Sequence, residues 1–301
     1  MKLYEFLEHV HRAYQPRSYL EIGINTGSSL ALSRTRTIAI DPAFEITQEI
    51  ACDVQVVKAT SDEFFARDDG LAHFSNGRID LAFVDGLHLF EFALRDFMNV
   101  ERHSAWTSVI VIDDVLPRNP NRARRNRGTL AAWPGDVFKI TEVLTRYRPD
   151  LFLLSLDTEP TGVLLILGAD RQSRVLEDHY DEIVAQYVYP DPQRVPDAVL
   201  RRETAIDPIS IQSSDLWTDL RNAREAALSR EAGWEAIRRA AESTARPAQS
   251  QGLTPRPRPI GATRPTKVER KSTVRIGAAP TIPSRAVAAL RRRLRPLRRR
   301  L

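Results

Sequence analysis

Short apolar runs alternate with amphipathic segments along the first half of the sequence, and nearly every run ends in an acid or a glycine. Strands that are buried on both faces have continuous apolar runs, so this alternation predicts a parallel sheet covered by helices on both faces. The five runs lie at about 18–22, 37–41, 53–58, 79–84 and 108–112. Two further runs, at 151–156 and 162–167, are expected to complete a seven-stranded, mostly parallel sheet. Ligands of such sheets bind beyond the carboxyl ends of the strands, so the residues after each run are the functional candidates.

The first apolar run leads into a turn that contains two glycines. Gly23 and Gly27 let the backbone turn tightly and approach a nucleotide-like ligand, and the pattern predicts a strand that hands over to a helix. Asp41 ends the second run, at the position where an acid commonly binds the hydroxyl pair of a ribose. Together these residues predict an adenosine-containing cofactor. The alternative is that both glycines serve only the turn.

The overall charge of +5 conceals two oppositely charged parts. Residues 241–301 contain 16 Lys and Arg and 2 acids, whereas residues 1–240 contain 28 Lys and Arg and 37 acids. The Pro- and Arg-rich tail, 243–301, is expected to be disordered, and its last segment, 285–301, is expected to become a basic amphipathic helix on an acidic surface. Such a tail would contact an anionic membrane surface or a nucleic acid without sequence specificity.

The remaining bulk features indicate a cytoplasmic protein, at most peripheral at the inner face of a membrane. No apolar run reaches 18 residues, and the N-terminal segment lacks the basic start and apolar centre of a signal peptide. Cys52 is the single cysteine, which excludes an internal disulfide and fits a reducing compartment.

Several motifs together distinguish between possible cofactors. A nicotinamide fingerprint needs a third small residue about three positions after the second glycine, where this chain has Ser28-Ser29-Leu30. The pattern Glu21-x-Gly23-x-x-x-Gly27-x-Ser29 resembles instead motif I of class I S-adenosylmethionine-dependent methyltransferases. The blocks Asp85-Gly86-Leu87-His88, Asp96-Phe97 and Asp113-Asp114 resemble the branch of that family with a D-G-x-H signature, which includes sugar and small-molecule O-methyltransferases. Trp133-x-Gly135-Asp136 resembles a further block of one bacterial branch.

The resemblance covers about residues 15–170 and implies a Rossmann-like class I methyltransferase fold. The methyltransferase domain is expected over 1–188, and the pattern of residues beyond the resemblance predicts a Pro-rich connection and C-terminal helix over 189–242 and the tail over 243–301. The resemblance also implies that S-adenosylmethionine binds with its methionine side at the glycine turn, its ribose at Asp41 and its adenine near Ser61 or Asp62. Asp62 has the alternative of capping a helix. The implied cofactor-binding residues are Glu21, Gly23, Asn25, Gly27, Ser28, Asp41, Ser61, Asp62 and Asp85.

Three carboxylates follow two runs that are expected to be neighbouring strands. Asp85, Asp113 and Asp114 would repel one another unless protons or a cation neutralised them, and oxygen ligands of this kind suit Mg²⁺. In metal-dependent O-methyltransferases, such a set holds the ion against two vicinal hydroxyls of the acceptor. The alternative is that the acids cap loops or bind the cofactor with no metal present.

His88 follows Asp85 by three positions and is the candidate base for the hydroxyl proton, with Asp85 as the second catalytic candidate. Its alternative role is to orient another group. A long polar loop at 115–132 carries five arginines and is expected to act as a lid or to bind a phosphate or carboxylate of the substrate, unless the arginines are simply solvated. Trp133, just after the loop, could stack on a sugar or anchor the loop.

These features predict an S-adenosylmethionine-dependent O-methyltransferase that acts on a sugar, glycan or small molecule with help from Mg²⁺. One alternative is a nucleic-acid methyltransferase, although enzymes that methylate base amino groups generally carry Pro-Pro-aromatic after the fourth strand, where this chain has Gly86-Leu87-His88. A second alternative is a non-catalytic module tethered by the basic tail to a membrane or a nucleic acid. A third is a relative of the antibiotic hydroxylase-associated proteins of this group, with a different chemical role.

Overall fold

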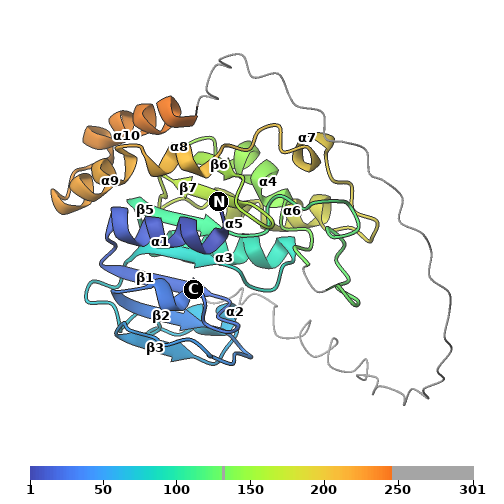
Figure 1. Ribbon diagram of the computed structural model, residues 1–301, viewed down its shortest axis with the longest axis horizontal. Helices are drawn as coiled ribbons and strands as arrows, with labels where there is room; N and C mark the ends of the chain where they lie inside the picture. Colours follow the sequence, from blue (N-terminus) through green and yellow to red (C-terminus); the bar gives the residue numbers. More distant parts are fainter. Residues whose placement is uncertain (131–132, 246–301) are drawn as a thin grey trace, which may run out of the picture. The chain divides into compact units, whose positions relative to one another are not determined.

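A seven-stranded sheet forms the centre of the computed structural model, which describes residues 1–130 and 133–245 (Figure 1). The strand order is β3-β2-β1-β4-β5-β7-β6. The first five strands in this order pair in parallel, and β7 is antiparallel to both β5 and β6. The strands are β1 Ser18–Ile22, β2 Arg36–Ile40, β3 Val54–Val57, β4 Ile79–Val84, β5 Ser104–Ile112, β6 Phe152–Leu156 and β7 Val163–Leu167. The predicted seven-stranded, mostly parallel sheet is confirmed.

Helices cover both faces of this sheet, as the continuous apolar strands require. On one face, α2 to α6 pack against strand residues such as Leu20 and Ile110. On the other face, α1, α8, α9 and α10 pack against residues such as Tyr19 and Val111. The helices are α1 Leu3–Tyr14, α2 Ser61–Phe65, α3 Phe90–Arg102, α4 Lys139–Tyr147, α5 Val175–Asp178, α6 Tyr180–Tyr187, α7 Asp197–Leu200, α8 Pro208–Gln212, α9 Leu216–Glu225 and α10 Arg230–Ala245.

The glycine turn does not lead into an α-helix, so that expectation is wrong. Residues 23–35, all of which the structure describes, contain the 3₁₀ turn η1, Leu30–Leu32, and no α-helix. The connection from β1 to β2 is short, and Ser33 bonds to the Thr37 hydroxyl at 2.8 Å just before β2 begins. Serine and threonine side chains that bond locally in this way compete with helix formation.

The segment after β2 folds back over the glycine turn. The amide of Glu45 donates to the carbonyl of Asn25 at 2.9 Å, and the amide of Thr47 donates to the carbonyl of Thr26 at 3.0 Å. The Ile46 side chain lies against Gly27, where an added Cβ would come within 3.1 Å of it. The glycine turn therefore has protein on one side, and only its other side faces the carboxyl ends of the strands.

Two segments in the second half of the chain each contain a pair of helices. The segment at 170–187 contains α5 and α6, and the segment at 215–241 contains α9 and most of α10, separated by Ala227 at φ 49°. Helix α10 runs to Ala245, slightly beyond the expected start of the tail. Residues 246–301, which hold nearly all of the predicted disordered tail, lie outside the described residues. Among the helices that the structure describes, none is long and apolar enough to cross a membrane.

Candidate functional site

The carboxyl ends of β1, β4 and β5 meet at the centre of one edge of the sheet. Gly23, at φ 92°, follows β1 and lies so close to β4 that an added Cβ would be 1.9 Å from the carbonyl oxygen of Asp85. The amide of Asp85 donates to Ile22 at 2.8 Å, and the amide of Asp113 donates to Val84 at 3.0 Å. The close approach of the backbones at positions 23 and 85 therefore requires a glycine at position 23. The same approach fixes the point at which the loop that begins with Asp85 leaves β4.

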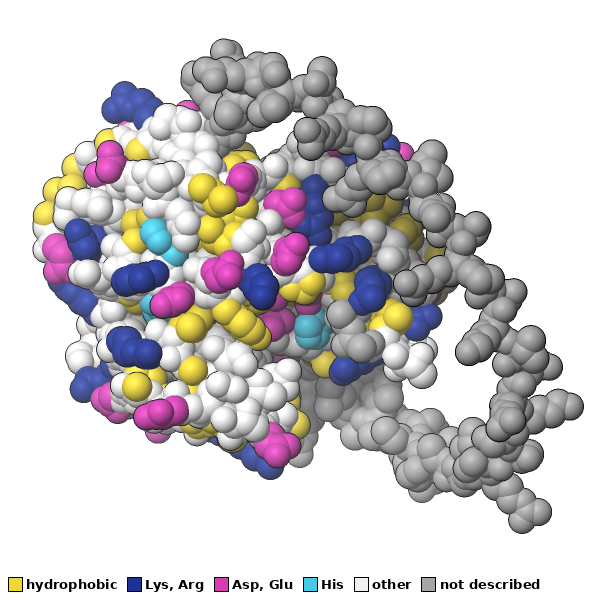
Figure 2. All heavy atoms as spheres, viewed as in Figure 1, with side chains coloured by type: hydrophobic (Ala, Val, Ile, Leu, Met, Phe, Trp, Pro, Cys, Tyr) yellow, Lys and Arg dark blue, Asp and Glu magenta, His cyan; other side chains and the backbone are white. Residues whose placement is uncertain are grey.

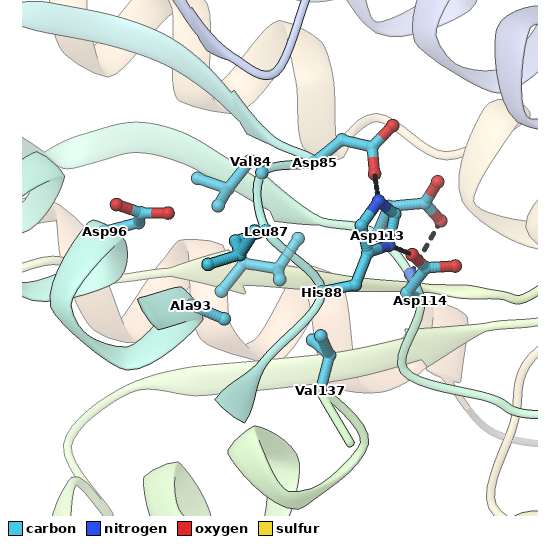
Figure 3. A pocket seen from close by; sticks show the side chains of 11 residues that line it. Val84, Asp85, Leu87, His88, Ala93, Asp96, Asp113, Asp114 and Val137 are labelled. Atoms are coloured by element: carbon cyan, nitrogen blue, oxygen red, sulfur yellow. Dashed lines mark hydrogen bonds and ion pairs between the residues drawn. The ribbon is translucent and has the colours of Figure 1, made fainter. Parts of the chain in front are cut away.

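A cluster of two carboxylates and an imidazole lies at this edge (Figure 3). The Nδ1 atom of His88 bonds to the carboxylate of Asp114, and its Nε2 atom lies 3.8 Å from Oδ1 of Asp85. One ligand atom from each of Asp85, His88 and Asp114 can be chosen so that all three lie within 4.8 Å of one another. The side chains of Asp85 and His88 keep 32% of their surface exposed, so the cluster can be reached from solvent.

Asp113 lies behind this cluster and is held by its neighbours. Its Oδ1 accepts from the amide of Asp114 at 2.8 Å and from the hydroxyl of Thr161 at 3.4 Å. Burial and the nearby carboxylate of Asp114 raise the pKa of Asp113, while burial and the carboxylates of Asp113 and Asp114 raise the pKa of Asp85. Carboxyl groups with such neighbours favour the binding of a cation, because a cation would relieve their mutual repulsion.

The segment that opens with Trp133 packs directly on the loop of His88. An added Cβ at Gly135, which has φ 57°, would lie 1.7 Å from the carbonyl oxygen of His88. The ring of Trp133 lies 5.6 Å from the imidazole, and its Nε1 donates to the carbonyl of Arg124 at 2.6 Å. Trp133 therefore anchors the arginine-rich loop, as one interpretation predicted, and lies next to the cluster, while its stacking on a sugar stays a prediction.

Asp136 is fully buried and works as an anchor behind the site. Its Oδ1 accepts from the amide of Phe90 at 2.9 Å, and its Oδ2 accepts from Arg125 at 2.7 Å and from Lys139 at 2.8 Å. Arg125 also pairs with Glu91. Burial lowers the pKa of Lys139, whose ammonium also donates to the carbonyl of Tyr187. Arg125 is thus a structural cation of the loop and is not available to clamp a substrate.

The acids expected at the cofactor are held by the protein itself. Glu21 is buried and accepts from Ser29 at 2.6 Å and from Tyr19 at 2.7 Å, and burial raises its pKa to about 7. Asp41 accepts from the amides of Ile24 at 2.8 Å, Asn25 at 3.0 Å and Ala43 at 2.7 Å. A carboxylate has about four acceptor positions, so Asp41 keeps about one for a ligand hydroxyl.

The two residues expected near the adenine point to partners in α3. Asp62 pairs with Arg95 at 2.7 Å, and the hydroxyl of Ser61 donates to Asp96 at 2.5 Å. Asp96 lines the same small pocket as Asp85 and His88, and burial raises its pKa to about 7. Asp96 lies with Leu94 and Phe97 on the buried face of α3. An acid on an otherwise apolar helix face is the sequence signal that could have identified it as a site residue.

Residues 20–115 match a family model described as a methyltransferase domain. A search among curated proteins finds no sequence that matches this chain.

Solved structures with a similar fold include O-methyltransferases. The O-methyltransferase TomG from Streptomyces achromogenes, involved in tomaymycin synthesis and solved with S-adenosylmethionine (SAM), is 20% identical, with 56% of this chain and 79% of that chain covered and a TM-score of 0.42. An O-methyltransferase from Bacillus cereus, solved with SAH, is 16% identical, with 55% and 80% covered and a TM-score of 0.40. MycE methyltransferase from the mycinamycin biosynthetic pathway, solved with Mg and SAH, is 14% identical, with 55% and 50% covered and a TM-score of 0.39.

Proposed function

We propose that this chain, whose residues 20–115 match a family model of a methyltransferase domain, transfers a methyl group from S-adenosylmethionine to a hydroxyl oxygen of a sugar, glycan or small molecule. The observation that carries the proposal is the convergence of Asp85, His88 and Asp114 beside the glycine turn. A base and several carboxylates next to a cofactor turn suit the removal of a proton from an acceptor hydroxyl.

The residues around the turn fit a cofactor that carries positive charge. Burial and then the carboxylates of Asp113, Asp114, Glu21 and Asp41 raise the pKa of Asp85, and a cationic ligand would relieve the repulsion among these acids. S-adenosylmethionine, when bound, supplies an activated methyl group on a positively charged sulfur. Asp41 would accept from a ribose hydroxyl, while the glycine turn from Gly23 to Ser28 would face the methionine end.

His88 is the residue that accepts the proton in this proposal. A bond from Nδ1 to the carboxylate of Asp114 requires that Nδ1 carries a proton, which leaves the lone pair of Nε2 free. Asp114 therefore selects the tautomer that can act as a base and stabilises the imidazolium that forms. The φ of 57° at His88 turns the side chain toward Asp114, and Gly135 packs against the same peptide.

Asp85 and Asp114 would hold Mg²⁺, since hard oxygen ligands are those that this ion prefers. Asp113, expected as a third ligand, lies behind them and accepts from the Asp114 amide and from Thr161. The ion, when bound, supplies a Lewis acid that lowers the pKa of an acceptor hydroxyl. An acceptor with two vicinal hydroxyls would suit such a site. The face of the protein seen in Figure 2 has acidic and basic side chains interspersed, which gives no support to a nucleic-acid acceptor on that face.

The first test is a calorimetric titration of S-adenosylmethionine into the full chain with and without MgCl₂. We expect saturable binding in both cases, followed by transfer to catechols or methyl glycosides that is stimulated by MgCl₂ and lost in EDTA. A folded protein that does not bind S-adenosylmethionine would overturn the proposal and leave a non-catalytic module.

Variants separate the chemical roles. His88→Gln is expected to lower transfer by about 100-fold or more while the affinity for S-adenosylmethionine stays within about threefold. Asp113→Ala is expected to abolish transfer while cofactor binding persists, and equal loss of both would move Asp113 to the cofactor site. Asp53→Asn is the matched control, because this exposed acid pairs with Arg36 at the start of β2, at the opposite end of the strands from the cluster. Full activity in His88→Gln would remove the histidine from the mechanism.

A further inference from the structure

Two arginines from distant parts of the chain donate to one carbonyl oxygen in the turn between β6 and β7. Arg118 belongs to the arginine-rich loop, and its Nε atom donates to the carbonyl of Pro160 at 3.1 Å. Arg202 follows α7, and its Nη2 atom donates to the same carbonyl at 3.0 Å and to the carbonyl of Leu116 at 3.3 Å. Two guanidinium groups on one oxygen repel each other, so the binding of an anion beside them would be favourable.

The protein neutralises only part of this positive charge. Arg202 pairs with Asp157 through its Nη1 atom. Arg118 is exposed, and among the residues that the structure describes no carboxylate pairs with it and the Pro160 carbonyl is its one side-chain acceptor. Burial and the charge of Arg118 lower the pKa of Arg202, which agrees with the close approach of the two cations. Both Nη groups of Arg118 therefore remain available to a ligand.

The turn that holds this arginine pair also borders the candidate site. Thr161 directly follows the shared carbonyl, and its hydroxyl donates to Asp113 at 3.4 Å. Arg118 follows Asp114 by four positions, so the Cα atoms of these two residues are at most about 14 Å apart. An acceptor whose hydroxyl lies at the cluster can therefore place a second group at Arg118.

We propose that the acceptor is an anion, and that Arg118, with Arg202 beside it, binds its oxyanion group while the hydroxyl to be methylated lies at the cluster. A guanidinium presents parallel N–H groups that match two oxygens of a carboxylate or a phosphate. The inference rests on the proposed function, because it takes the cluster as the place of transfer. It narrows the acceptor from any hydroxylated molecule to one that carries a carboxylate or a phosphate.

The test compares acceptors that differ only in the charged group. Protocatechuate carries a carboxylate that catechol lacks, and glucose-6-phosphate carries a phosphate that glucose lacks. Calorimetry with the full chain, with and without S-adenosylhomocysteine, is expected to show about tenfold tighter binding of the anionic member of at least one pair. The pair that shows this preference identifies the oxyanion.

Variants of Arg118 connect the preference to this side chain. Arg118→Ala is expected to lower the preference for the anionic member about tenfold, and Arg118→Lys about threefold, because lysine keeps the charge without the planar fork. Arg171→Ala is the matched control, since this exposed arginine follows the antiparallel strand β7 and so lies at the opposite edge of the sheet from the cluster. Thermal unfolding would report any loss of folding.

The outcomes separate this inference from the proposed function. A wild-type protein without any preference, or an Arg118→Ala protein that retains it, would overturn the inference while cofactor binding and transfer to neutral acceptors stand. A preference that depends on Arg118 in a protein that binds no S-adenosylmethionine would support the anion site and overturn the proposed transfer.

Discussion

Removing the charge of Asp136 should destabilise the protein strongly, although the residue belongs to a motif that also borders the candidate site. The side chain is completely buried and accepts from Lys139, which is 3% exposed, and from Arg125. Asp136→Asn leaves the Lys139 ammonium without its buried anion, and breaking a buried pair in this way costs about 3–5 kcal/mol. Arg125 keeps Glu91, so its contribution to the loss is small.

The expected loss can be measured by chemical and thermal unfolding. A loss of about 4 kcal/mol in a domain of this size corresponds to a fall in Tm of about 10 °C. Asp136→Ala should cost about 1 kcal/mol more, because the amide of Phe90 then loses its acceptor at 2.9 Å. Asp197→Asn is the control, since its pair with Arg201 is largely exposed and contributes little to stability.

A double variant tests whether an unpaired charge causes the loss. Lys139→Met combined with Asp136→Asn removes both charges, so its cost should be about 2 kcal/mol less than the sum of the single costs. Strictly additive costs would show that the two side chains are not energetically coupled. A cost for Asp136→Asn no larger than that of Asp197→Asn would refute the reasoning altogether.

Three further outcomes are expected. The pKa of Glu21 is about 7 in the folded protein, above its unfolded value, so its contribution to stability is present below about pH 4.5 and is lost as the pH rises through about 7. Urea unfolding at pH 5 and pH 8 should show a loss of about 3 kcal/mol in the wild type that Glu21→Gln lacks, and identical pH profiles would contradict this. Gly135→Ala should lower Tm and transfer activity far more than Gly77→Ala, because both glycines have positive φ but only the first lies against another backbone; equal effects would show that φ alone matters. Deleting residues 246–301 should leave S-adenosylmethionine affinity and transfer to a free acceptor unchanged, and a large loss with folding preserved would give the tail a role in catalysis.

The sheet could be predicted because its signal is local. A strand buried on both faces must be apolar along its whole length, so β1 and β4 are visible as runs of hydrophobic residues in the sequence. The prediction of a helix after the glycine turn is wrong, for a reason that is only partly local. The connection between β1 and β2 is short, and serine and threonine bonds before β2 compete with helical ones.

The site was predicted less completely than the sheet. Asp85 and Asp113 could be found because acids that follow neighbouring parallel strands must meet at one edge of the sheet. The structure also brings His88 to Asp114, which agrees with the expected cluster, while the roles in catalysis, cofactor binding and metal binding stay predictions.

The sequence by itself determined which residues lie at the carboxyl ends of the strands, because each of these acids directly follows an apolar run in the sequence. Only the tertiary structure decided what those residues bond to. Asp41 faces three amides, Asp62 faces Arg95, and Asp136 neutralises a buried lysine. The bonds of Asp41 to Ile24 and Asn25 and the pair of Asp62 with Arg95 join segments that are distant in the sequence, and the hydrogen bonds that satisfy a buried polar group are settled only when the chain has packed.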